Sequence, residues 1–182
     1  MTKRRFLFLL SSARSGGNTE AMARTAAAAL PPSVAQDWCD LTTATLPTFE
    51  DLRHGASYGP LSPIMANLAD RTMQASDIVF VAPLYWYGLP APAKLYLDHW
   101  SHWMRLPELG FKARMAGKRA WLIMAHAGST EAEIAPARDG LRLATAYLGM
   151  VWGDTLLADA NAPGDWQKDP QAQTMAPPFF AA

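Results

Sequence analysis

Residues 6–19 read FLFLLSSARSGGNT, five apolar residues followed by a polar stretch that contains two adjacent glycines. An alanine-rich segment comes next and ends before a Pro-Pro pair. A continuous apolar run is typical of a strand that is covered on both faces of its sheet. The chain is therefore predicted to open with a buried strand, a polar loop and a helix that is capped by Asn18 or Thr19 and runs to about Leu30.

The same strand–loop–helix order recurs along the rest of the chain. Further strands are predicted at residues 34–41, 77–83, 118–125 and 150–157. Helices are predicted at residues 62–74, 91–104 and 131–148, with irregular connections at 42–60 and 105–117. The buried side of the helix at 62–74 is predicted to carry Ile64, Met65, Leu68 and Met73. Alternating strands and helices require right-handed crossovers, so we expect an α/β fold with a doubly wound, mainly parallel sheet of about five strands and helices on both faces.

Length and composition indicate one globular domain, residues 1–182, with a mostly irregular tail at 158–182 that has one short helix near 170–175. Sixteen basic residues balance sixteen acidic ones, which gives no support to a nucleic-acid surface. The apolar run Phe6–Leu10 is too short for a signal peptide or a membrane span. Cys39 is the only cysteine, which excludes an intramolecular disulfide and favours the cytoplasm.

Three polar or aromatic loops follow predicted strands, and ligands of such sheets bind beyond the carboxyl ends of the strands. The first, SSARSGGNT, carries glycines, hydroxyls and Arg14 ahead of a helix N-terminus, a combination that suits an anion. It has neither a Lys-Ser/Thr pair nor a GxGxxG pattern, so a cofactor with a terminal monophosphate is favoured over a nucleoside triphosphate. The alternative is a tight turn before a well-capped helix.

The second loop, PLYWYGLPAP, places three aromatic residues in a row, Tyr85, Trp86 and Tyr87. Planar amphipathic rings around a glycine suit a flat ligand. A patch that contacts a second subunit is the alternative, and both can hold at once. The third loop, residues 126–130, adds an imidazole, a glycine and two hydroxyls beside the same predicted pocket.

With these motifs in view, SSARSGGNTEAMA resembles the phosphate loop of the NADPH-dependent FMN reductase family, among the flavodoxin-like NAD(P)H-quinone oxidoreductases. SDIVFVAPLYWYGLPAPAKLYLDHW and GKRAWLIMAHAGS are similar to that family's second and third motifs. The resemblance implies a flavodoxin-like fold with strand order 2-1-3-4-5. It implies that the FMN phosphate is held by Ser12, Arg14, Gly17, Asn18 and Thr19. It implies that the flavin ring is bracketed by Pro83, Leu84, Tyr85, Trp86, Tyr87 and Gly88, and on its other side by His126, Ala127, Gly128 and Ser129.

The implied function is that of an FMN-dependent NAD(P)H oxidoreductase, which reduces quinones, free flavin or similar small acceptors. The chemistry would occur on FMN, so no side chain is predicted to be catalytic and no metal is predicted. A homodimer is expected, with a tetramer as the alternative. Competing interpretations are a flavodoxin-like electron carrier without nicotinamide turnover and a relative that has lost its cofactor. His99 and His102, three residues apart on one helix, are expected to pack against Trp100, Trp103 or a partner subunit.

Overall fold

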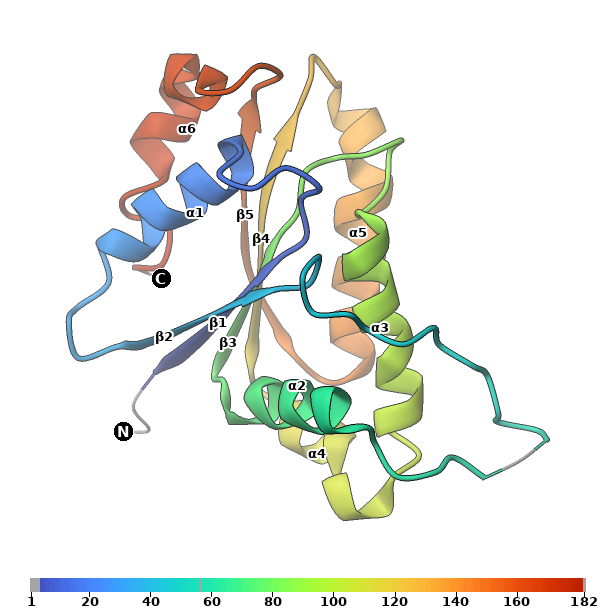
Figure 1. Ribbon diagram of the computed structural model, residues 1–182. Coiled ribbons are helices and arrows are strands. Elements are labelled where there is room, and N and C mark those ends of the chain that lie inside the picture. The colour runs from blue at the N-terminus through green and yellow to red at the C-terminus, as the bar shows by residue number, and fades with distance from the viewer. Residues whose placement is uncertain (1–3, 56, 182) are drawn as a thin grey trace.

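The structure is a computed structural model that describes residues 4–55 and 57–181 (Figure 1). Five strands form one sheet in the order β2-β1-β3-β4-β5, and every neighbouring pair is parallel. The strands are β1 (Arg5–Leu10), β2 (Ala35–Asp40), β3 (Asp77–Val81), β4 (Arg119–His126) and β5 (Val151–Asp159). This confirms the predicted doubly wound sheet and its strand order.

Helices cover both faces of the sheet, with α1 and α6 on one side (Figure 1). The opposite face is covered by α2, α3, α4 and α5. The helices are α1 (Asn18–Ala28), α2 (Pro63–Gln74), α3 (Ala91–Trp103), α4 (Phe111–Met115), α5 (Glu131–Tyr147) and α6 (Pro170–Met175). Two short 3₁₀ helices are η1 (Pro107–Leu109) and η2 (Asp165–Lys168).

The first strand shows why apolar runs rather than alternating patterns mark this sheet. Phe6 and Phe8 pack into the core under α1 and α6, whereas Leu7 and Leu9 pack into the core on the other face. Successive side chains of a strand point to opposite faces, so a central strand covered on both sides needs apolar residues at every position. All four of these side chains are buried.

Some sequence predictions about local structure were wrong. The connection at 105–117 contains η1 and α4, because Phe111 and Met115 bury themselves in the core. Ile64 is 38% exposed, whereas Met65, Leu68 and Met73 are buried as predicted. Ile64 lies in the first turn of α2 and is not among the buried residues of that helix.

The segment after β5 contains α6, which confirms the short helix predicted near 170–175, and also η2, which the sequence did not indicate. The two helices pack beside α1 and β5 (Figure 1). Phe180 packs edge-on against Phe6 and Phe8, and its carbonyl oxygen accepts a hydrogen bond from Arg4 Nη1 at 3.1 Å. Its neighbour Phe179 is also buried. Both aromatic side chains are therefore part of the core of this chain.

Trp121 on β4 anchors the core beneath this segment. Its indole is fully buried and donates a hydrogen bond to Asp77 Oδ1 at 3.0 Å. The register between β4 and β5 shifts between Ala120 and Leu122. There Gly153 lies against the indole face, and a Cβ at that position would be 2.4 Å from the ring. Within the described residues, none of the helices combines the length and apolar character that a membrane crossing requires.

Candidate functional site

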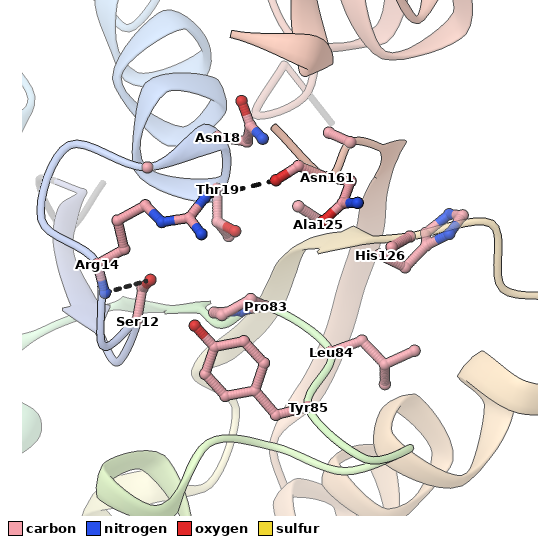
Figure 2. Close-up of a pocket in the computed structure, with 13 residues that line it drawn as sticks. Ser12, Arg14, Asn18, Thr19, Pro83, Leu84, Tyr85, Ala125, His126 and Asn161 are labelled. Atoms are coloured by element: carbon pink, nitrogen blue, oxygen red, sulfur yellow. Dashed lines mark hydrogen bonds between the residues drawn. The ribbon is translucent and has the colours of Figure 1, made fainter. Parts of the chain in front are cut away.

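A cavity of about 240 Å³ lies beyond the carboxyl ends of β1, β3 and β4 (Figure 2). It is the place where a doubly wound sheet binds ligands. The residues that line it are Ser12, Arg14, Gly17, Asn18, Thr19, Pro83, Leu84, Tyr85, Ala125, His126, Ala127, Ala160 and Asn161. Four loops contribute, which we call the first loop (11–17), the second loop (83–90), the third loop (126–130) and the fourth loop (160–164).

The first loop leads directly into the N-terminus of α1. Gly16 has a φ of +63°, a backbone conformation that side chains other than glycine rarely adopt. The N-cap is Gly17, and no side chain of the described residues caps the helix. The prediction that Asn18 or Thr19 caps it was wrong, because both residues already lie inside the helix. The first N–H groups of α1 therefore meet the cavity without a capping side chain, and an anion would satisfy them.

Charge in this cavity is positive on balance. Arg14 lines it, and the described lining contains no Asp or Glu. The Arg14 guanidinium extends across the cavity, where Nη1 lies 3.4 Å from the carbonyl oxygen of Asn161 (Figure 2). Glu20, the nearby acid in the first turn of α1, accepts hydrogen bonds from the Gly16 N–H and from Arg24. The cation and the helix dipole thus act together on whatever occupies the cavity.

Asn18 links the first loop to the fourth. Its Nδ2 donates to the carbonyl oxygen of Ala162 at 2.8 Å, and its Oδ1 accepts from the Gly164 N–H at 2.9 Å. The residue is only 7% exposed, and both hydrogen bonds are partly buried. Gly164 has a φ of +83°, which glycine adopts without strain. Asn18 fixes the wall of the cavity, and its predicted role in holding a phosphate stays a prediction.

The second loop begins as an extension of the sheet and ends in a tight turn. The Leu84 N–H donates to the carbonyl oxygen of Ala125 at 2.9 Å. Tyr85 and Gly88 then exchange backbone hydrogen bonds of 3.1 and 3.0 Å. The two residues between them, Trp86 and Tyr87, have φ values of 49° and 61°. This geometry is that of a type I′ turn, which normally uses Asn and Gly, so two aromatic residues here carry backbone strain.

This aromatic turn, residues 85–88, presents its rings to solvent. Trp86 is 94% exposed, and Tyr85 and Tyr87 are exposed by 42% and 52%. Tyr85 lines the cavity, whereas Trp86, Tyr87 and Gly88 stand outside its lining. Their predicted contacts with a flavin ring stay predictions.

The third loop reaches the cavity through His126 and Ala127. His126 Nδ1 accepts a hydrogen bond from the Ser129 N–H at 3.3 Å, and Figure 2 shows the ring directed away from Arg14. The Gly128 N–H donates to Asp159 Oδ1 at 2.7 Å. Gly128 and Ser129 therefore support the loop from outside the lining, and their predicted contacts with the ring stay predictions.

Sequence reasoning did not identify the contributions of Ala125, Ala160 and Asn161. Ala125 is the next-to-last residue of β4, and the other two follow β5 directly. The sequence did contain a sign of this loop. The stretch NAPGDW follows the last predicted strand, and the loops after parallel strands lie at the same edge of the sheet, where the ligand binds.

The two histidines on α3 lie outside the cavity and contact the long connection between β2 and α2. His99 Nε2 lies 2.8 Å from the carbonyl oxygen of Pro47, and His102 Nε2 lies 3.2 Å from that of Gly59. His102 also stacks on Tyr58. The expected packing against Trp100, Trp103 or a partner subunit stays a prediction. Among the residues that the structure describes, no group of His, Cys, Asp or Glu side chains is arranged to hold a metal.

Residues 4–176 match the sequence pattern of a protein family that is described as having a flavodoxin-like fold. The chain belongs to this family. The match spans almost all of the described residues and confirms the recognition that the motifs of the first, second and third loops supported.

The flavodoxin-like chain also resembles individual proteins. YwqN of Bacillus subtilis (strain 168), provisionally named an NAD(P)H-dependent FMN-containing oxidoreductase, is 28% identical over 165 residues, which are 90% of this chain and 89% of YwqN. The structure of the Trp repressor binding protein from B. subtilis superposes with a TM-score of 0.75 at 23% identity, over 96% of this chain and 97% of that one.

An FMN-dependent NADH-azoreductase from Bacillus anthracis, solved in complex with FMN, superposes with a TM-score of 0.63 at 12% identity, over 97% and 96% of the two chains. At such identities the two solved structures show the shared fold.

Proposed function

We propose that this chain is an FMN-dependent NAD(P)H oxidoreductase that reduces quinones, free flavin or similar small acceptors. The observation that carries the proposal is the uncapped N-terminus of α1 opening, beside Arg14, into a cavity whose described lining has no carboxylate. Such a site suits a phosphate monoester. The resemblance of the chain to YwqN supports the same activity.

The residues that line the cavity fit both the phosphate and the flavin ring of FMN. Ser12, Arg14 and Thr19 would hold the phosphate together with the backbone N–H groups of α1. Pro83 and Tyr85 would lie against one side of the flavin ring, and Ala127 would lie at the other. When bound, FMN supplies the hydride and electron transfer chemistry, and the protein binds and orients it.

The protein's own side chains offer little competing chemistry. Burial raises the pKa of the Cys39 thiol, so it is a poor nucleophile. His126 is engaged with the backbone of its own loop. The site residues are therefore proposed to bind, orient and exclude water, with no catalytic side chain. The buried, unpaired state of this one cysteine also supports our proposal of a cytoplasmic setting.

We propose a homodimer, with a tetramer as the alternative. The cavity of about 240 Å³ is smaller than most sites for small molecules, so part of a bound cofactor would project beyond it. Trp86 follows Tyr85, which lines the cavity, and is 94% exposed. A large exposed aromatic residue is typical of an interface, and a second copy would cover both it and the projecting ring.

The test begins with the purified protein mixed with FMN and freed of excess by gel filtration. A retained flavin spectrum that bleaches on anaerobic addition of NADPH or NADH, and returns on addition of a quinone, supports the enzyme. Retained flavin that neither nucleotide bleaches identifies the electron carrier instead. A colourless protein overturns both proposals.

A further inference from the structure

We propose that Asn161, on the fourth loop, binds the ribityl chain of the cofactor through its carboxamide. This inference rests on the proposed function and adds a binding residue from a part of the chain that the motifs of the first three loops do not include. The fourth loop lines the cavity through Ala160 and Asn161.

The position of Asn161 along the cavity identifies what it would bind. Its backbone carbonyl oxygen lies 3.4 Å from Arg14 Nη1, so the residue lies next to the part of the cavity that is predicted to hold the phosphate. In Figure 2 the side chain of Asn161 is drawn next to Ala125, and both residues line the cavity. Tyr85 and Ala127, which we propose to contact the ring, line the same cavity. Figure 2 shows Tyr85 across the cavity from Asn161. A group between phosphate and ring would face the sugar-alcohol chain of a flavin.

The chemistry of the side chain suits that part of the ligand. A carboxamide has two N–H donors and one oxygen acceptor, and hydroxyl groups both donate and accept. In the described part of the chain, no protein group makes a hydrogen bond to the Asn161 carboxamide, whereas the Asn18 carboxamide is bound at both atoms. The other described residues on this wall and beside it, Ala125 and Ala160, have no polar side-chain atoms.

The fourth loop is also held firmly enough to present the carboxamide in one place. Asn18 bonds it twice, to Ala162 and Gly164. The Ala160 N–H donates to the carbonyl oxygen of His126 at 2.7 Å. Binding groups on a fixed backbone lose less conformational entropy when a ligand is bound.

The experiment uses three ligands that differ by one part each: FMN, riboflavin without the phosphate, and lumiflavin without both phosphate and ribityl chain. Dissociation constants are measured by flavin fluorescence for the parent protein, Asn161→Ala and Arg14→Ala. We expect Asn161→Ala to weaken FMN and riboflavin by the same factor, about three- to tenfold, and to leave lumiflavin unchanged. Arg14→Ala should weaken FMN alone. Asn67→Ala, an exposed residue on α2 outside the cavity lining, is the matched control.

Each other outcome overturns the assignment in a distinguishable way. A loss confined to FMN in Asn161→Ala would place the carboxamide at the phosphate. A loss that extends to lumiflavin would place it at the ring, and no loss would remove it from the site. If the parent protein fails to bind FMN at all, the proposed function fails, and that result is visible before any variant is compared. Because Asn161 is exposed, the variant should fold, which a melting curve checks.

Discussion

The strain in the aromatic turn can be measured directly by replacing Trp86. This residue has a φ of 49°, and the left-handed backbone region costs an ordinary residue about 1–2 kcal/mol. Asn tolerates that region far better, whereas Ala keeps the penalty because it keeps the Cβ. Since the Trp86 ring is 94% exposed, both replacements remove almost the same small amount of packing within the chain.

We therefore expect Trp86→Asn to be more stable than Trp86→Ala by about 1 kcal/mol. In a chain of this length that difference corresponds to a melting temperature higher by about 2–4 °C. Thermal unfolding followed by circular dichroism measures it, and urea unfolding gives the free energy independently. Comparison of the two variants cancels any loss of contacts that Trp86 makes with a cofactor or a second subunit. Equal melting temperatures for Asn and Ala would refute the strained turn.

The same pair of variants tests function separately from stability. If the Trp86 ring contacts the bound flavin, FMN affinity should fall in both variants by the same factor. A fall in only one of them would mean that the backbone of the turn, rather than the ring, determines binding.

Three further predictions concern a packing contact, two hydrogen bonds and an ion pair within the chain. Gly153→Ala should lower the free energy of unfolding by about 3 kcal/mol, because its Cβ would lie 2.4 Å from the buried Trp121 ring; urea unfolding measures this. Asn18→Ala removes two partly buried hydrogen bonds, so we expect weaker FMN binding and faster amide hydrogen exchange in the fourth loop. The hydrogen bonds from the Arg71 guanidinium hold the pKa of Asp37 below its ordinary value of 3.8. This pair should therefore stabilise the fold above that pH, and the melting temperature should decline as the pH falls further and Asp37 is protonated. In Asp37→Asn this decline at acid pH should be smaller.

Each of these has a control or a contradicting result. Gly140→Ala, in an open position on α5, should raise stability by about 0.5–1 kcal/mol, and a similar rise at Gly153 would contradict the packing. Unchanged exchange in the fourth loop of Asn18→Ala would mean that other contacts hold that loop. An acid-side decline that persists in Asp37→Asn would assign it to other carboxylates.

The fold was predictable because a continuous apolar run such as Phe6–Leu10 indicates a strand and also indicates that both of its faces are buried. The candidate site was predictable to the extent that it lies in loops directly after such runs. Asn161 was missed because NAPGDW carries no apolar periodicity, so that only its place after the last strand pointed to the site. The contact of this loop with Asn18 on α1 depends on tertiary packing.

The conformation of the aromatic turn was missed for a different reason. Local preference opposes a type I′ turn at Trp-Tyr, and only the surrounding hydrogen bonds, such as that of Leu84 to Ala125, fix it. The partners of His99 and His102 lie in a connection without periodicity, which no spacing rule could have placed against α3.

The docking of Phe180 on β1 has a consequence for how the chain is made. Arg4 and Phe180 are joined by a hydrogen bond across 176 residues of sequence. At roughly 5–20 residues per second, the ribosome needs about 9–35 s to synthesise that interval. Throughout it, the aromatic face of the first strand, Phe6 and Phe8, lacks part of its cover, because Phe180 does not yet exist. The nascent chain therefore presents an apolar strand that chaperones can bind until the last segment closes over it.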